Sequence, residues 1–87
     1  MELVILTPEK ELFKGTVKSV KVPGVRGQFE ILANHAPIVS TLGAGVVRVL
    51  DSESGKFEFP IERGFVEVLN NEVSVLALEE GTLPAAE

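Results

Sequence analysis

The stretch that decides the fold is residues 22–37, VPGVRGQFEILANHAP. Pro23-Gly24 favours a type II turn, because proline presets the first central φ and glycine accepts the positive second one. Gly27 then frees the backbone just before an extended run with apolar residues at alternate positions. Asn34 tolerates the left-handed region and predicts a second turn. Two turns that enclose one short strand indicate β structure.

Strand signals continue on both sides of this stretch. Short apolar or alternating runs bounded by turn residues predict strands at residues 2–7, 11–17, 18–22, 28–32, 38–42, 46–50, 56–62, 65–69 and 72–78. No window carries the i, i+3, i+4, i+7 apolar pattern of an amphipathic helix. The sequence predicts an all-β fold: a small β-sandwich or flattened barrel of about 8–10 short, mostly antiparallel strands.

Glycine, proline and asparagine refine this pattern. Gly15 interrupts an apolar run and predicts a bulge or bend. Pro60 lacks a backbone N–H, so its strand is expected at a sheet edge or at a break in pairing. Asn70-Asn71 joins two matched runs and predicts a type I′ hairpin, which needs positive φ at both central residues.

The composition restricts the possible functions. The chain has 87 residues, of which 45 % are apolar and 24 % charged, as is ordinary for one small soluble domain. It has no cysteine, which excludes disulfides, thiolate metal sites and thiol nucleophiles, and a single histidine argues against a zinc site. The net charge of −5 disfavours nucleic acid and anionic lipid as direct partners. We expect a protein partner, no metal and no cofactor.

The two ends of the chain add expectations about location and domain limits. The N-terminal apolar run is too short for a signal sequence, and no segment approaches the roughly 18 apolar residues of a membrane span. We therefore expect a cytosolic protein that associates with a membrane only through a partner. Residues 1–80 are expected to form one β-sandwich domain, and residues 81–87 an acidic tail.

His35 is the obvious candidate for acid–base chemistry. A general base needs a substrate pocket and an orienting partner. The acids nearest in sequence, Glu30 and Asp51, belong to other predicted elements, and no nucleophile motif such as Gly-x-Ser-x-Gly adjoins the histidine. We therefore expect a turn histidine that hydrogen-bonds backbone carbonyls, or a partner contact, in a protein that is not an enzyme.

Two glycine-rich segments and one lysine suggest other functions that must be weighed, a phosphate-binding loop and a carrier domain. Residues 24–27 and 43–45 lack the Lys-Ser/Thr ending and the helix of a phosphate loop, so both are expected to be turns. Lys56 stands at the mouth of a predicted β-hairpin, and biotinyl and lipoyl carrier domains carry a modified lysine at a hairpin tip. Its neighbours Gly55 and Phe57 differ from the Met-Lys-Met or Asp-Lys-Ala of those domains. A solvated loop lysine is favoured, and a stand-alone carrier or adaptor domain is the alternative.

Several motifs follow one another at a distinctive spacing. They are Leu12-Phe13-Lys14-Gly15, Val20-Lys21-Val22-Pro23-Gly24, His35-Ala36-Pro37 with Leu42 and Gly45, Gly64-Phe65-Val66-Glu67-Val68, and Asn71-Glu72-Val73-Ser74-Val75. Their order resembles the epsilon subunit of F-type ATP synthase over residues 3–78. Departures include Ala33-Asn34, where that family commonly has Pro-Gly, and Leu78, where it usually has aspartate.

The resemblance implies a mechanical function without catalysis. An epsilon subunit sits at the foot of the central stalk, where it couples the gamma subunit to the c-ring for proton-driven ATP synthesis. The implied location is peripheral, on the cytoplasmic face of the bacterial inner membrane. The family's ring-contacting loop aligns with Arg26, Gln28, Phe29, Asn34 and His35, which we therefore expect to face the c-ring.

One feature of the family is absent from this sequence. The family's β-domain is normally followed by a helical hairpin that carries ATP binding and inhibition in many members. We expect a naturally short epsilon subunit that couples rotation, binds no ATP and does not switch to an inhibitory extended state.

Overall fold

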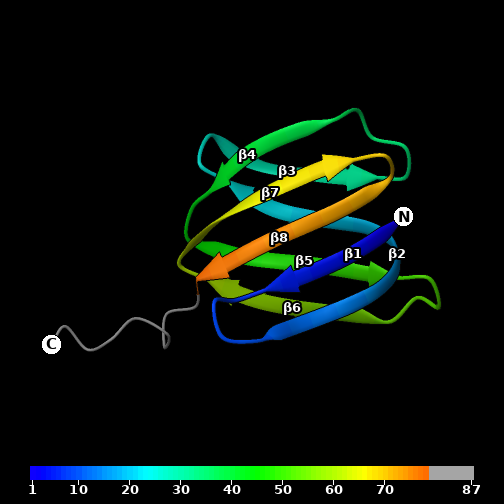
Figure 1. The fold of residues 1–87 in the computed structure, drawn as a ribbon, viewed down its shortest axis with the longest axis horizontal. Coiled ribbons are helices and arrows are strands. Elements are labelled where there is room, and N and C mark those ends of the chain that lie inside the picture. The colour runs from blue at the N-terminus through cyan, green and yellow to red at the C-terminus, as the bar shows by residue number, and fades with distance from the viewer. Residues whose placement is uncertain (79–87) are drawn as a thin grey trace, which may run out of the picture.

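The computed structural model describes residues 1–78, which form eight strands (Figure 1). The strands are β1 (Glu2–Leu6), β2 (Glu11–Gly24), β3 (Gly27–Leu32), β4 (Ile38–Leu42), β5 (Gly45–Asp51), β6 (Lys56–Ile61), β7 (Arg63–Leu69) and β8 (Glu72–Leu78). All ladders are antiparallel except the one between β1 and β8. The predicted all-β sandwich is confirmed, and the predicted tail, residues 81–87, lies outside the described residues.

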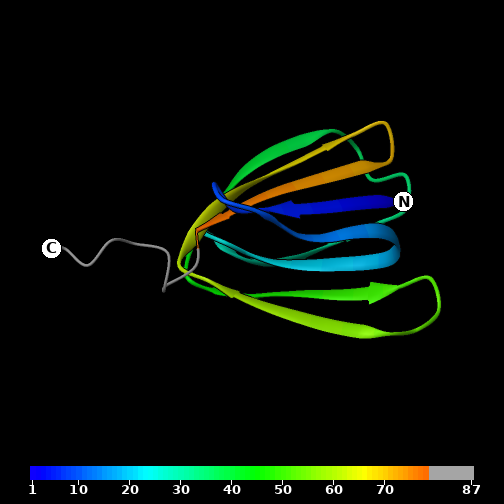
Figure 2. The same ribbon diagram turned by 60° about the horizontal axis from the view of Figure 1, so that its bottom comes forward.

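Two layers face each other across the core. One layer contains β4, β7, β8 and β1, and the other contains β3, β2, β5 and β6 (Figure 1). β2 belongs to both, because its first half pairs with β1 and its second half with β3 and β5. Figure 2 shows β5 and β6 set apart from β7, β8 and β1, with β2 running between them.

The long strand β2 replaces two predicted strands. Residues 11–17 and 18–22 form one strand because backbone pairing continues through both, with a register shift against β5 between Val17 and Ser19. Gly15 pairs with β1 in the regular part of that ladder, so the bulge predicted there is wrong. The ladders of β2 are irregular on either side of Gly15: against β1 between Ile5 and Leu6, and against β5 where β2 passes from one layer to the other.

The turn predicted at Pro23-Gly24 is also wrong. Both residues extend β2, where Gly24 pairs with Gly27 on one side and Leu42 on the other. A Cβ at Gly24 would lie 2.7 Å from the carbonyl oxygen of Gly27, so close approach of the backbones requires the glycine. The turn falls at residues 25–26, and Gly27 takes the positive φ of 132°.

The turns predicted at Asn34 and at Asn70-Asn71 and the edge predicted at Pro60 are confirmed. Asn34 has a φ of 64° in the turn after β3. Asn70 and Asn71 have φ values of 53° and 63°, both positive as a type I′ hairpin requires. Pro60 lies on β6, which is the last strand of the sheet path and therefore an edge.

The core is built from alternate residues of the strands. On β7 and β8 burial alternates residue by residue, which is the pleat of strands with one covered face. The buried apolar residues are Leu3, Ile5, Val17, Val20, Val22, Ile31, Leu42, Val47, Val49, Ile61, Val66, Val68, Val73, Val75 and Ala77. Their β-branched side chains suit a pleated, half-buried surface. The opposite face of each layer forms the outer surface of the sandwich.

Candidate partner-docking surface

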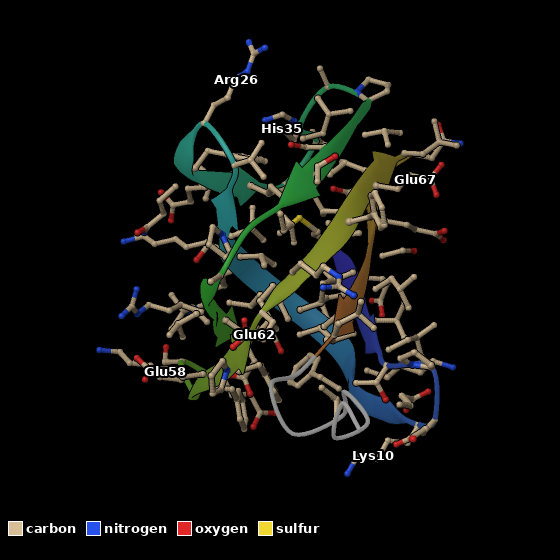
Figure 3. The ribbon with its side chains drawn as sticks, turned by 90° about the vertical axis from the view of Figure 1, so that its left-hand side faces the viewer. Lys10, Arg26, His35, Glu58, Glu62 and Glu67 are labelled. Atoms are coloured by element: carbon tan, nitrogen blue, oxygen red, sulfur yellow. The ribbon has the colours of Figure 1, made fainter. Side chains whose placement is uncertain are left out.

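The five predicted ring-contact residues fall into two groups at opposite ends of β3. Arg26 lies in the β2–β3 turn with Gln28 and Phe29 directly after it, whereas Asn34 and His35 lie in the loop beyond the strand. A strand rises about 3.3 Å per residue, so roughly 20 Å separates the groups. Figure 3 shows Arg26 extending from its turn, away from the body of the sandwich. The structure does not bring the five residues together.

The first group lines an open hollow of about 600 Å³ between β3 and β4. Residues 39–41 of β4 form part of its lining. The ring of Phe29 is half-buried and packs against the core, while Arg26 and Gln28 are exposed. This end of the sandwich therefore offers one guanidinium and one amide for polar contacts.

His35 is a turn histidine, as predicted. Its half-buried ring has Nδ1 2.8 Å from the carbonyl oxygen of Ala36. The N–H of Asn34 donates to Oδ1 of Asn71 at 2.7 Å, which ties the β3–β4 loop to the β7–β8 turn. No side chain of the described residues hydrogen-bonds the ring, so none of them orients it as a general base.

The remaining sequence candidates lie on strands or in the loops that join them. Residues 24–27 and 43–45 lie at strand ends, and no helix adjoins them that could present its N-terminal amides to a phosphate. Lys56 begins β6 with an exposed side chain. Within residues 1–78, no His, Asp or Glu side chains gather in a group able to hold a metal ion. Nor does that part of the chain include a helix with the length and apolarity of a membrane span.

One surface, on the outer face of β4, β7, β8 and β1, was not predicted from the sequence. Alternation on β7 and β8 predicts polar outward residues, yet Phe65 and Leu76 point outward and are 54 % and 43 % exposed. The strand register sets them opposite each other, with Leu6 of β1 next in the row. Val39 of β4, 76 % exposed, lies beside this row. We call Leu6, Val39, Phe65 and Leu76 the apolar ridge.

Local structure fixes the apolar ridge in place. Gly64 lets β7 and β8 approach closely, because a Cβ at this position would lie 2.2 Å from the carbonyl oxygen of Leu76. At the other end of the row, Leu6 is followed by the buried Thr7. The Oγ1 of Thr7 accepts a hydrogen bond from the N–H of Lys10 at 3.1 Å, which holds the bend after β1.

A shallow hollow of about 350 Å³ borders the apolar ridge. It is lined by Leu6, Val39, Phe65, Val66, Glu67, Ser74, Val75 and Leu76. Among the described residues that line it, Glu67 alone is charged. Exposed apolar side chains that gather in this way mark interaction surfaces, whereas isolated ones do not. An outward phenylalanine in an alternating strand is a sequence signal for such a surface, but only the register shows that the ridge is continuous.

The outer face of the other layer is charged. The register aligns Glu30, Lys21, Arg48 and Glu58 in one row across β3, β2, β5 and β6. Nε of Arg48 lies 3.2 Å from Oε2 of Glu58, and Lys21 stands directly opposite Arg48 on the neighbouring strand. A row of charges is suited to water, so the sandwich has one apolar and one hydrated outer face.

The fold and the apolar ridge define the class of protein: a small β-sandwich domain with one apolar outer face. Residues 1–80 match the family model described as "ATP synthase, Delta/Epsilon chain, beta-sandwich domain". The chain belongs to this family, and the resemblance found in the sequence is confirmed.

Relatives of known name agree with this assignment. The ATP synthase epsilon chain of Leptospira borgpetersenii is 47 % identical over 76 residues, which are 87 % of this chain and 59 % of that one. The chain thus spans about three-fifths of the length of that relative. The ATP synthase epsilon chain of Chlorobium limicola is 43 % identical over 75 residues, which are 86 % of this chain and 85 % of the relative.

A solved structure has the same fold. A chain of the Euglena gracilis mitochondrial ATP synthase, in a structure of its OSCP, F1 and c-ring, superposes with a TM-score of 0.82. The match covers 88 % of this chain and 49 % of that one, at 23 % identity. At this identity the likeness establishes the β-sandwich architecture.

Proposed function

We propose that this chain is a non-catalytic rotor subunit that couples the gamma subunit to the c-ring of an F-type ATP synthase. The observation that carries the proposal is the apolar ridge. A domain that transmits torque must be held firmly by its neighbour, and buried apolar area supplies most of the free energy of such an interface. The family match of residues 1–80 names the complex in which that neighbour is found.

The apolar ridge is the proposed docking surface for gamma. Phe65 and Leu76 stand at its centre, where a partner excludes water most completely. Large apolar anchors at the centre of an interface carry a disproportionate share of the binding energy. The β7–β8 pair beneath them is paired in register over seven residues of each strand, so we expect little ordering entropy to oppose docking.

The c-ring side is proposed to lie at the end of the sandwich that carries Arg26. Arg26, Gln28 and Phe29 share one hollow there, whereas Asn34 and His35 lie beyond the far end of β3. A contact confined to one end of the sandwich does not reach both groups. We therefore assign the ring contact to Arg26, Gln28 and Phe29. Asn34 and His35 are proposed to hold the β3–β4 loop in place instead.

The proposed location follows from these partners. Attachment to the ring places the domain at the cytoplasmic face of a bacterial inner membrane, peripheral and held only through the complex. The carrier-domain alternative, based on Lys56, has no counterpart in the family match. Intact-mass measurement of natively expressed protein checks it, since a biotinyl or lipoyl adduct on Lys56 would revive that alternative.

The test of gamma docking compares two exposed apolar residues on opposite outer faces. Phe65 is 54 % exposed on the ridge, and Leu32 is 52 % exposed on β3. Phe65→Ala is expected to weaken binding to a catalytic-head complex that contains gamma and has been stripped of epsilon, by roughly 30-fold or more. Leu32→Ala is the matched control and should bind like the wild type. Equal affinity of both variants would exclude the ridge as the docking surface.

The ring assignment has its own test. The double variant with Arg26→Glu and Gln28→Lys is expected to lower the recovery of whole synthase that retains the c-ring, while binding to the catalytic head stays normal. Lys10→Glu reverses an exposed charge in the β1–β2 loop, which Figure 3 shows far from Arg26, and serves as control. Normal recovery of the double variant would remove the assignment.

A further inference from the structure

Glu67 interrupts the apolar outer face that carries the ridge. In the strand register it has Val39 of β4 on one side and Ser74 of β8 on the other. Phe65 and Leu69 precede and follow it on the outward side of β7. Figure 3 shows Glu67 on the outer side of β7, pointing away from the sandwich. Its carboxylate therefore stands in an apolar surround without a cation beside it in the hollow described above.

Within residues 1–78, no other side chain of this face forms an ion pair with Glu67. Farther along, Glu72 of β8 and Glu2 of β1 stand directly opposite each other. They share a second hollow of about 250 Å³ with Lys14, and Oε2 of Glu2 accepts a hydrogen bond from the hydroxyl of Thr16. Lys14 lies in the same cross-strand row as Glu67, with Ser74 and Val4 between them, and it lines the hollow of the other two acids instead.

Arg63 lies at the opposite end of β7, where its register partner is Leu78. It stands four residues from Glu67 along the strand, a rise of roughly 13 Å. Among residues 1–78 the one ion pair, between Arg48 and Glu58, belongs to the other layer. The docking face is therefore apolar and acidic, with Glu67 nearest the ridge.

A partner that docks on this face removes water from the carboxylate of Glu67. In the free chain its carboxylate is hydrated, and the free energy of hydration is lost when a partner excludes water. A carboxylate buried without a partner costs several kcal/mol, whereas one matched by a cation with good hydrogen bonds contributes specificity. A surface that buries the ridge and leaves Glu67 unmatched would bind poorly.

We propose that the ridge face selects a gamma surface that is apolar and carries a lysine or arginine opposite Glu67, so that Glu67 is the specificity-determining acid of the interface. This inference rests on the proposed docking of gamma to the ridge. The ridge supplies affinity, and Glu67 rejects partners that lack the matching cation.

The experiment measures affinity for the epsilon-stripped catalytic-head complex that contains gamma, at low and high salt. Glu67→Gln keeps the shape and removes the charge, and is expected to weaken binding at least about 30-fold. It should also flatten the salt dependence, because the wild-type charge pair is screened by salt. Glu67→Leu should weaken binding too, although it makes the face more apolar. Glu30→Gln removes an exposed charge from the other outer face and is the control.

The outcomes separate the two proposals. If Phe65→Ala weakens binding and Glu67→Gln does not, the charge selection is wrong and ridge docking stands. If neither variant weakens binding, ridge docking itself fails. Tighter binding by Glu67→Leu would show that the acid only keeps the free face hydrated, and would overturn the inference. Sedimentation of the free chain tests whether a second copy of the chain occupies the ridge face. A dimer that Phe65→Ala dissociates would assign the face to that second copy and would also overturn the inference.

Discussion

On both outer faces of the sandwich every second side chain of a strand points outward. The two faces differ in whether those side chains are apolar or charged. On the β4–β7–β8–β1 layer the register brings Phe65, Leu76 and Leu6 into one row. On the other layer it brings Lys21, Arg48 and Glu58 into one row. Exposure alone does not separate the faces, because Leu32 on the charged side is 52 % exposed. Phe57 is 41 % exposed although its register partner, the buried Val49, sets it on the core-facing side of β6.

Continuity is what distinguishes the two faces. The ring of Phe57 packs at a tilt against that of Phe13, with ring centroids 5.3 Å apart, so Phe13 partly covers it. Leu32 stands opposite Ser19 at one end of β3. The ridge residues instead adjoin one another and a common hollow. A docking surface is therefore recognised by how exposed apolar residues line up across strands.

The largest effect is expected from a charge placed at the centre of the ridge. Leu76→Glu would bury an unmatched carboxylate beneath the gamma subunit, which costs roughly 3–5 kcal/mol of binding free energy. Titration calorimetry with the epsilon-stripped catalytic head measures this loss. Leu32→Glu makes the same change on the charged face and should leave affinity within about twofold of wild type. Similar losses in both variants would mean that the two faces do not differ in function.

A smaller effect, on stability, is expected from the strand spacing beneath the ridge. In Gly64→Ala the new Cβ would meet the carbonyl oxygen of Leu76 at 2.2 Å, so β7 or β8 must shift. Overpacking of this kind typically lowers the free energy of unfolding by about 1–3 kcal/mol. Urea denaturation measures the change. Gly43→Ala is the control, because its Cβ would meet only Val25, at 3.7 Å. A variant at Gly64 as stable as wild type would show that the β7–β8 pair adapts easily.

The glycines and asparagines show how far sequence reasoning extends. Asn34, Asn70 and Asn71 were predictable because a positive φ is a local property of the residue. The function of Gly24 was not, because it depends on the distance between backbones of β2, β3 and β4. A Pro-Gly pair satisfies the rules for a turn and for a tightly paired strand end, and only tertiary pairing decides between them.

The apolar ridge likewise combines features that the local sequence pattern predicts with features that depend on tertiary pairing. Alternation predicts that Phe65 and Leu76 point outward, since this follows from the two-residue period of a strand. Their union with Leu6 depends on the parallel pairing of β1 with β8, which joins the two ends of the described chain. No local pattern specifies that pairing. The residues predicted from family resemblance, Arg26 and His35 among them, are separated because a whole strand lies between them.

The smallest effect is expected on the charged face. Nε of Arg48 and Oε2 of Glu58 are 3.2 Å apart, but their side chains are 49 % and 64 % exposed. An ion pair in this setting contributes at most about 1 kcal/mol, and Lys21 directly opposite Arg48 opposes it by like-charge repulsion. A double-mutant cycle with Arg48→Ala and Glu58→Ala, followed by urea denaturation, should give a coupling below about 0.5 kcal/mol that vanishes in high salt. Affinity for the catalytic head should not change in any member of the cycle. A large coupling energy would mean that this ion pair stabilises the fold. A loss of binding would mean that the charged face also contacts the partner, so that the two faces do not differ in function as proposed.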